Sequence, residues 1–451
     1  MHLHILGICG TFMGGIAAIA RQAGYRVTGC DANVYPPMSE QLAALGIELI
    51  EGYREDQLSL DPDVWVIGNA ITRGNPLMEA ILDRGARYQS GPEWLRENVL
   101  AKKWVLAVSG THGKTTTAAM LAVILDRCGL DPGFLIGGIP TDFSISARLT
   151  SSELFVIEAD EYDTAFFDKR SKFVHYRPRT AVINNIEFDH ADIFNDLADI
   201  ERQFRHFVRI IPRSGLILAN GQDDVVKRVL TQSWTPIEQF AAESGWTIGN
   251  IDPSGPFDVF CRGQFEGHVK WALTGEHNRL NGLAAIAAAR HAGVEPKAAI
   301  EALSSFGGVR RRMELRGVER GVTVYDDFAH HPTAIQMTLE GLRTKVGSAR
   351  ILAVLEPRSN TMKLGRMKDA LPASLAAADR VYFYANGLGW DPVALFRAAG
   401  REVTNAADVD ALVAAIIADA RSGDQIVVMS NGGFGGIHGK LLSALRAGTT
   451  Q

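Results

Sequence analysis

The stretch Val105–Thr117, VLAVSGTHGKTTT, predicts the architecture of the region around it. Apolar residues 104–108 predict a buried strand, a polar turn with two glycines follows, and a helical run begins at Lys114. Glycines let backbone N–H groups point inward, and a helix N-terminus favours anions, so this order predicts a phosphate cradle. We expect Lys114 to reach the terminal phosphates of a nucleotide and the Thr115 hydroxyl to hold Mg²⁺.

The spacing of this turn differs from the common phosphate-loop pattern GxxxxGK[ST], which would need glycine at position 108, where the chain has Val. The form present, G-T-H-G-K-T-T, is shorter by two residues. An ordinary glycine turn before a helix is the alternative, but Lys-Thr-Thr directly after the turn fits phosphate binding better. The residues expected around the phosphates are Gly110, Thr111, His112, Gly113, Lys114, Thr115 and Thr116.

The chain has 451 residues, which is too long for one ordinary hydrophobic core. We expect three α/β domains, at 1–102, 103–314 and 315–451. The net charge of −5 gives no reason to propose nucleic acid or an anionic membrane as a partner. The four cysteines are far apart, which favours reduced thiols in the cytoplasm. The N-terminus lacks the pattern of a signal peptide, and no run of about 18 apolar residues predicts a membrane span.

The first hundred residues read as a Rossmann-like domain. A short strand at 2–6 leads through a glycine turn to a helix at 12–23, and a second strand at 25–30 ends at Asp31. The pattern GxGxxG is not met, because Cys9 stands where its second glycine belongs. We expect a pocket for a nucleotide or diphosphate near Gly10, with a plain packing turn as the alternative. Further strand–loop units, at 64–68 and 87–89, predict a parallel sheet.

Acidic and histidine side chains follow two further predicted strands of the central region. Glu158 comes directly after an apolar strand at 155–158, and His190 follows a strand at 180–183. Because the carboxyl ends of parallel strands meet at one edge of a sheet, these groups are placed to hold Mg²⁺ or contact phosphate. A solvated surface acid or a hydrogen-bonded structural histidine is the alternative at each position.

The second half of the central region changes character. Short alternating runs within 233–273, including 257–261 and 269–273, predict a small antiparallel flap. The alanine-rich helix that follows carries Asn278 and Asn281 three residues apart, and an amide can read an adenine edge. Asn278 as a plain helix cap is the alternative. The basic cluster 310–312 is either a solvated turn or, beside a triphosphate, the source of a guanidinium for the transferred phosphoryl group.

Strand and helix alternation returns after residue 315 and predicts a second Rossmann-like sheet. Strands are expected at 322–325, 351–355, 381–384 and 425–429, each followed by a polar loop. The loop at 358–363 carries cationic groups suited to a carboxylate-bearing ligand. The loop at 430–436 offers backbone N–H groups for the same purpose. Solvated connecting loops are the alternative for both.

Taken together, these motifs resemble the Mur ligase family, the three-domain ATP-dependent amide-forming enzymes of peptidoglycan synthesis. The resemblance covers essentially the whole chain. It rests on GTHGKTTT at 110–117, EADEYD at 158–163, NNIEFDH at 184–190, GEHNRLN at 275–281, the pair Arg311–Arg312, and DDFAHHPT at 326–333. Four further stretches make it most similar to the branch that ligates a preformed murein tripeptide: GICGTFMGG at 7–15, CDANVYPPM at 30–38, EPRSNTMK at 356–363 and SNGGFGGIH at 430–438.

The resemblance implies a role for each matched residue. Lys114 and its turn would hold the ATP phosphates, and the Mg²⁺ ligands would be Thr115, Glu158 and His190. The other ATP contacts would be Asn278 and Asn281 at adenine, Arg312 at the γ-phosphate and Asp327 at the ribose. The UDP-sugar would be held by Gly10, Thr11, Asp31, Asn69 and Thr72, and the peptide by Arg358, Ser359, Asn360 and Lys363.

One departure from the family pattern concerns a carbamylated lysine, which bridges the metals in several relatives. Between His190 and Pro212 this sequence has no lysine, so we expect none here, as in the L-alanine-adding branch. The implied reaction uses ATP to phosphorylate the carboxylate of UDP-N-acetylmuramate and then joins the acyl phosphate to the tripeptide amine.

Other functions remain open at this stage. Within the family, the alternative is the ligase that adds free L-alanine to UDP-N-acetylmuramate. A folylpolyglutamate-type synthetase would leave the N-terminal domain without a role. A non-catalytic nucleotide-binding protein would not need the acids, His190 and Arg312 together. An NAD oxidoreductase fits least, given Cys9 in the glycine turn.

Overall fold

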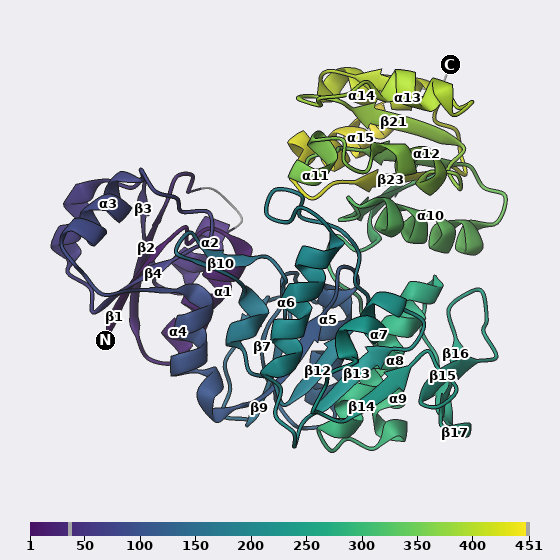
Figure 1. Cartoon of the computed structure of the whole chain (residues 1–451). Helices are drawn as coiled ribbons and strands as arrows, with labels where there is room; N and C mark the ends of the chain where they lie inside the picture. Colours follow the sequence, from purple (N-terminus) through teal and green to yellow (C-terminus); the bar gives the residue numbers. More distant parts are fainter. Residues whose placement is uncertain (35–37, 448–451) are drawn as a thin grey trace.

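Three separate sheets, in chain order, dominate the computed structural model, which describes residues 1–34 and 38–447 (Figure 1). Part of the stretch CDANVYPPM, namely 35–37, lies outside the described residues. The sheets have five, ten and six strands, and β10 (Asp163–Ala165) and β11 (Asp168–Ser171) form a separate two-stranded hairpin. Among the described residues, none of the helices combines the length and the apolarity that crossing a membrane requires.

The N-terminal sheet is parallel, with the strand order β3-β2-β1-β4-β5, as the predicted βαβ alternation requires. The order reverses between β1 and β4, so the turns after these two strands lie at a topological switch point. The elements are β1 (His2–Leu6), α1 (Thr11–Gln22), β2 (Arg26–Asp31), α2 (Met38–Ala44), β3 (Glu48–Glu51), a 3-10 turn (Glu55–Leu60), β4 (Val64–Ile67), α3 (Pro76–Asp83), β5 (Tyr88–Ser90), α4 (Gly91–Asn98) and a 3-10 turn (Leu100–Lys102).

The glycine pair at the start of α1 serves packing. A Cβ on Gly14 would lie 2.7 Å from Met38 Sδ, and a Cβ on Gly15 would lie 2.3 Å from Leu135 Cδ1. Because Leu135 belongs to the central sheet, Gly15 lets α1 pack directly onto that sheet. The small residues of GTFMGG therefore fix the N-terminal domain against the central one.

Burial of His4 predicts a pH-dependent stability. His4 is fully buried in β1, with Nδ1 2.8 Å from Thr28 Oγ1, and burial lowers its pKa from 6.5 to about 4. Above pH 6.5 the imidazole is neutral in both the folded and the unfolded chain, so it does not make the free energy of unfolding depend on pH. Below pH 6.5 the unfolded chain binds a proton that the folded chain excludes, so stability falls between pH 6.5 and 4, by up to about 3 kcal/mol.

Denaturant unfolding at pH 7.5 and pH 5 checks this expectation. The loss of stability on acidification should be smaller in His4→Leu than in the parent chain, even if the variant is less stable at both pH values. Equal losses in the two proteins would show that His4 does not exclude the proton.

The central sheet has the order β17-β16-β15-β14-β13-β12-β6-β9-β7-β8. Its middle strands β9, β6 and β12 are neighbours and parallel, so their carboxyl ends meet. The elements are β6 (Trp104–Ser109), α5 (Lys114–Arg127), β7 (Gly133–Leu135), β8 (Ala147–Arg148), β9 (Leu154–Glu158), β10 (Asp163–Ala165), β11 (Asp168–Ser171), a 3-10 turn (Lys172–His175), β12 (Thr180–Ile183), α6 (Leu197–Arg209), β13 (Leu216–Asn220), α7 (Asp224–Leu230), β14 (Ile237–Phe240), β15 (Trp246–Gly249), β16 (Phe257–Cys261), β17 (Gln264–Val269), α8 (Glu276–His291) and α9 (Pro296–Ser304).

The antiparallel part of this domain differs in detail from the prediction. β15, β16 and β17 are antiparallel as expected, but they extend the edge of the central sheet. The expected strand at 269–273 is wrong, because β17 occupies 264–269. A two-residue turn at Arg262–Gly263, both with positive φ, pairs Cys261 with Gln264, and this register uses up the strand before residue 270.

The C-terminal sheet has the order β18-β19-β23-β20-β21-β22, with only the β18–β19 pair antiparallel. Buried apolar clusters lie on both of its faces. The elements are β18 (Glu314–Glu319), β19 (Val322–Asp327), α10 (Pro332–Val346), β20 (Ile351–Leu355), α11 (Asn360–Lys363), a 3-10 turn (Lys368–Ala370), α12 (Leu371–Ser374), β21 (Arg380–Tyr384), α13 (Pro392–Ala398), β22 (Thr404–Ala406), α14 (Val409–Asp419), β23 (Gln425–Met429), a 3-10 turn (Phe434–Gly436) and α15 (Ile437–Ala447).

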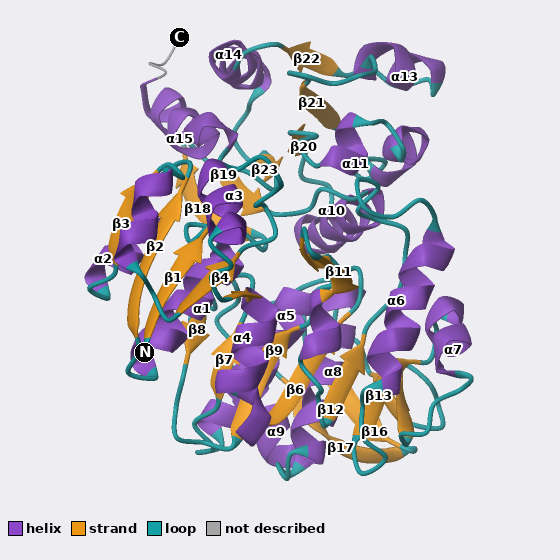
Figure 2. Cartoon of the chain, turned by 60° about the vertical axis from the view of Figure 1, so that its left-hand side comes forward, coloured by secondary structure: helices purple, strands orange, loops and turns teal. Residues whose placement is uncertain are grey.

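Helix α10 lies between the C-terminal sheet and the central domain in both views (Figures 1 and 2). A Cβ on Gly341 of α10 would lie 3.4 Å from the Cα atom of Gly275, at the start of α8. The second half of α10 therefore packs against the start of α8.

Candidate active site

The predicted phosphate turn joins β6 to α5. Gly110 and Gly113 both have positive φ, at +129° and +80°, and α5 begins at Lys114. The turn is held from behind by Asn185, whose backbone carbonyl accepts the Thr111 N–H at 3.0 Å and whose Oδ1 accepts the His112 N–H at 2.7 Å. Among the described residues, no side chain caps the N-terminus of α5. The first amides of this helix are therefore free for an anion.

Gly113 allows no side chain. A Cβ there would lie 2.4 Å from Asn281 Oδ1 and 3.0 Å from Asn184 Nδ2, and its φ is left-handed. We expect Gly113→Ala to strain the backbone of the turn, at a cost of about 1–3 kcal/mol, or to shift the turn. Either change should weaken nucleotide binding several-fold or more. Calorimetry with a non-hydrolysable ATP analogue measures this effect. The matched control is Gly129→Ala, with φ of +78° but no atom within 4 Å of its Cβ; equal losses in both variants would contradict the expectation.

Thr115, Glu158 and Arg312 converge beside this turn from three separate segments. The Thr115 hydroxyl donates to Glu158 Oε1 at 3.0 Å, and Arg312 Nη2 lies 3.4 Å from Thr115 Oγ1. The second oxygen of Glu158 accepts the Gly137 N–H at 2.7 Å. Burial raises the pKa of Glu158, although Lys114 and the Gly137 N–H oppose that rise. The group combines a hydroxyl, a carboxylate and a guanidinium at the carboxyl edge of the sheet.

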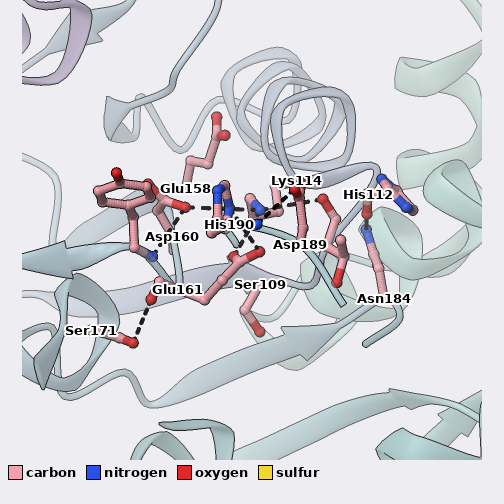
Figure 3. Close-up of polar contacts among 12 residues, drawn as sticks. Ser109, His112, Lys114, Glu158, Asp160, Glu161, Ser171, Asn184, Asp189 and His190 are labelled. Carbon is pink, nitrogen blue, oxygen red and sulfur yellow. Dashed lines mark hydrogen bonds and ion pairs between the residues drawn. The ribbon is translucent and has the colours of Figure 1, made fainter. Parts of the chain in front are cut away.

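Lys114 and His190 share one buried acid (Figure 3). Lys114 Nζ lies 2.8 Å from Glu161 Oε2 and 3.9 Å from Asp160 Oδ1, and His190 Nε2 lies 3.5 Å from Glu161 Oε1. Burial alone would lower the pKa of Lys114, but the carboxylates of Glu161 and Asp160 raise it above its usual range. Burial likewise opposes charge on His190, yet the contact with Glu161 raises its pKa to about 9.

Two groups of side chains in the described part of the chain have the composition and spacing to hold a metal ion. One is Asp160, Glu161 and His190. The other is His112, Glu187 and His331, which joins the phosphate turn to the start of α10. In the first group, two carboxylates and an imidazole have ligand atoms within 4.8 Å of one another, and the buried Glu161 Oε1 faces His190 Nε2 at 3.5 Å, so this donor set fits a cation.

The loop at 358–363 of the C-terminal domain lies beside the loop that carries His190. Thr361 Oγ1 donates to Asp189 Oδ1 at 3.2 Å and accepts the Ala191 N–H at 3.1 Å. Asn360 Nδ2 donates to Asp192 Oδ2 at 3.2 Å, and Ser430 donates to Glu356. The loop at 358–363 therefore contacts the central domain, and the loop at 430–436 contacts Glu356, two residues before the first loop begins.

Comparison with known proteins matches three consecutive regions of the chain. The model described as "Mur ligase family, catalytic domain" matches residues 2–103, "Mur ligase middle domain" matches 108–289, and "Mur ligase, glutamate ligase domain" matches 311–432. A UDP-N-acetylmuramate–L-alanyl-γ-D-glutamyl-meso-2,6-diaminoheptandioate ligase of Escherichia coli K12 is 56% identical over 449 residues, 99% of this chain and 98% of that protein. The chain belongs to the Mur ligase family.

Two more distant relatives help to place the chain within this family. The crystal structure of a murein peptide ligase from Psychrobacter arcticus 273-4 is similar with a TM-score of 0.78 and 46% identity, and the match covers 100% of both chains. A UDP-N-acetylmuramate–L-alanine ligase of Syntrophomonas wolfei is 35% identical over 394 residues, 84% of this chain and 82% of that protein. The predicted membership of the Mur ligase family and the predicted α/β fold are both confirmed.

Four residues predicted to contact ATP in this Mur ligase are buried or hydrogen-bonded within the protein. Asn281 is buried, with Oδ1 behind Gly113, and Asn278 Nδ2 donates to the Thr274 carbonyl at 2.7 Å. Asp327 is buried and accepts the N–H groups of Met313 and Ala329, each at 2.8 Å. Thr116 is buried in the first turn of α5. The nucleotide contacts of these residues stay predictions.

The residues predicted to bind the UDP-sugar lie at the switch point of the N-terminal sheet. Gly10 precedes α1, and among the described residues no side chain caps that helix. Asp31, at the end of β2, accepts the Cys9 N–H at 2.9 Å. The half-buried Asn69 and the exposed Thr72 follow β4, and the exposed Thr11 opens α1. All five line the edge where ligands bind in open α/β sheets.

The residues predicted to bind the peptide differ in what they contact. Arg358 and Lys363 are exposed. Ser359 Oγ caps α11 by accepting the Met362 N–H at 3.3 Å, and Asn360 contacts the central domain as described above. Ser359 therefore has a structural contact, whereas the two cations face solvent.

Sequence reasoning missed residues that stand inside the motifs it used. Glu161 is the main partner of Lys114, and Asn185 holds the phosphate turn. Glu187 and Thr361 join the central and C-terminal domains. Each lies inside one of the quoted motifs, so the motif was the available signal, but the sequence does not show which way these side chains point.

Proposed function

We propose that the protein is an ATP-dependent amide ligase that joins the carboxylate of UDP-N-acetylmuramate to the amine of L-alanyl-γ-D-glutamyl-meso-diaminopimelate. The observation that carries the proposal is 56% identity, over 99% of this chain, to a relative named for that reaction. The L-alanine ligase relative is 35% identical over 84% of the chain, which favours the tripeptide over free L-alanine. We place the reaction in peptidoglycan recycling in the cytoplasm.

A carboxylate is a poor electrophile, so the proposed reaction activates it before the amine attacks. Transfer of the γ-phosphoryl group of ATP to the carboxylate gives an acyl phosphate and ADP. The peptide amine then forms the amide bond, inorganic phosphate leaves, and the amine releases a proton. Lys114, Arg312 and the amides at the start of α5 are placed to stabilise negative charge on the phosphoryl group.

The acids of the central edge fit Mg²⁺, for which we propose Thr115, Glu158 and His190 as ligands. Thr115 and Glu158 are already in contact, and His190 lies beside Glu161 in the group that these two residues form with Asp160. When bound there, Mg²⁺ would neutralise phosphate charge. Around it, Glu161 orients Lys114 and His190 at the same time.

The three sheets support a division of labour among the proposed domains 1–102, 103–314 and 315–451. The N-terminal edge would hold the UDP-sugar, the central edge ATP, and the C-terminal loops the peptide. Arg312 lies two residues before β18 and contacts Thr115, which supports a C-terminal domain attached close to the proposed reaction centre. Closure of the domains would exclude water, which would otherwise hydrolyse an acyl phosphate.

One experiment tests the substrate assignment. The purified protein is incubated with ATP, Mg²⁺ and UDP-N-acetylmuramate, together with either the tripeptide or L-alanine, and products are identified by mass spectrometry. We expect the UDP-linked tripeptide to form, with phosphate release that depends on the tripeptide. Formation of UDP-N-acetylmuramoyl-L-alanine as the preferred product would instead assign the chain to the L-alanine-adding reaction.

A further inference from the structure

We infer that Glu187 is a positioning residue that couples the phosphate turn to the C-terminal domain. This inference rests on the proposed function, because it concerns how that reaction centre is assembled. Glu187 follows β12 and lies between the turn of 110–113 and the first residues of α10.

Glu187 is attached to the phosphate turn through both its backbone and its side chain. Its N–H donates to Thr111 Oγ1 at 2.8 Å, and the same hydroxyl donates to the Glu187 carbonyl at 3.3 Å. Its carboxylate oxygen Oε2 lies 3.3 Å from His112 Nε2. A movement of the turn is therefore transmitted directly to this carboxylate.

The same carboxylate oxygen contacts the start of α10. Thr333 Oγ1 donates to Glu187 Oε2 at 2.7 Å, and His331 Nδ1 lies 3.7 Å from that oxygen. His331 Nε2 donates to the carbonyl of Phe188, the next residue, at 3.3 Å. The central and C-terminal domains are thus joined at Glu187 by side chains 146 positions apart in the sequence.

The charge state of Glu187 suits this role. Burial alone would raise its pKa, but the hydrogen bond from His112, with further contributions from Thr333 and His331, lowers it to about 2. The group is therefore an ionised acceptor throughout the physiological range, and it attracts donors from both domains at once.

The triad of His112, Glu187 and His331 is complete without a metal ion. Glu187 Oε2 has His112 and Thr333 as partners. His331 Nδ1 accepts the Thr333 N–H at 3.2 Å, while Nε2 faces the Phe188 carbonyl. Both nitrogens of His331 and the shared carboxylate oxygen already have partners. The geometry therefore favours a contact between the two domains over a cation site.

Coupling of this kind is reciprocal. If nucleotide binding at the turn favours docking of the C-terminal domain, then docking strengthens nucleotide binding by the same factor. Removing the joint leaves the turn able to bind ATP but places Arg312 and the C-terminal loops less accurately. We therefore expect kcat to fall about 10- to 100-fold in Glu187→Ala, while the KM for ATP changes by a smaller factor.

A double-mutant cycle with Thr333→Val tests the contact. Thr333→Val alone should lower kcat, and the double variant should be no slower than Glu187→Ala, since the joint is already lost. Glu187→Gln, which keeps an acceptor for Thr333, should recover part of the rate. The matched control is Thr344→Val on the same helix, whose hydroxyl bonds Glu340 within α10. Additive losses, or a loss confined to the KM for ATP, would overturn the inference.

Hydrogen exchange provides a readout that does not depend on ligation. Adding a non-hydrolysable ATP analogue with Mg²⁺ should protect the amides at the start of α10 in the parent chain and in Thr344→Val, but not in Glu187→Ala. Equal protection in all three would overturn the coupling, even if the protein ligates as proposed. Failure of the parent chain to make the tripeptide product would refute the proposed function alone.

Discussion

Replacing Lys114 by methionine is expected to lower kcat/KM for amide formation by about 1,000-fold or more. Lys114 is the first residue of α5, and the uncapped amides of a helix N-terminus favour an anion there. A group that stabilises developing phosphoryl charge is worth at least this factor in comparable sites. Rates of phosphate release and product formation, measured at saturating ATP, report the loss.

The structure complicates the single variant, because Lys114 is also the partner of Glu161. Glu161 is 1% exposed, and removing one member of a buried ion pair costs about 3–5 kcal/mol. Activity lost in Lys114→Met alone therefore has two causes, the missing ammonium and the lower stability of the fold. The double variant Lys114→Met/Glu161→Gln removes the orphaned charge, so it should unfold at a temperature nearer to that of the parent chain while remaining inactive.

A surface lysine supplies the control for this experiment. Lys227 forms an exposed pair with Asp224, so Lys227→Met should change neither the rate nor the stability appreciably. A folded double variant that ligates at the parent rate would show that the turn does not bind the phosphates through Lys114.

The strands that the sequence predicted best are buried, parallel strands. The expected runs at 180–183, 351–355 and 425–429 coincide with β12, β20 and β23. Each is covered on both faces, so it reads as an uninterrupted apolar run with polar residues after it. The prediction of a strand at 269–273 was wrong because a short half-buried edge strand has no such apolar run. The turn at 262–263 sets the register of β17 instead.

The order of the strands predicted which residues gather at the site. It did not predict which of their side chains contact one another. Glu158 and His190 were expected near the turn because β9, β6 and β12 end at one edge. Which acid of 158–161 would face Lys114 depends on the path of the loop after β9, which no motif encodes. The Glu187–Thr333 contact depends on how two domains dock, and that information is distributed over the whole interface.

In the basic cluster 310–312, too, the sequence did not show which partner each side chain contacts. Arg311 Nη2 donates to the carbonyls of Ser430 and Gly432 at 2.6 and 2.7 Å, so it holds the loop at 430–436 of the C-terminal domain. Arg312 instead reaches across to Thr115 in the central domain, at 3.4 Å. Both guanidinium groups lie over the Phe328 ring, at 5.1 and 5.0 Å, yet they serve different domains.

Arg312→Ala is therefore expected to lower kcat by about 1,000-fold, as for other arginines that stabilise a transferred phosphoryl group. Arg312→Lys should recover little, because an ammonium offers neither the planar fork nor the stacking of a guanidinium on Phe328. Arg311→Ala should mainly lower the unfolding temperature, because its loss leaves the Ser430 and Gly432 carbonyls without this donor.

Steady-state kinetics and thermal unfolding, measured side by side on the two alanine variants, separate these roles. The Arg312 variant should keep the parent unfolding temperature within a few degrees and lose the chemical step, since the side chain acts on the reacting group. The Arg311 variant should show the reverse pattern. If both arginines gave the same loss of kcat with unchanged stability, the cluster would act as one diffuse positive charge, and the contact with Thr115 would not mark the position of the phosphoryl group.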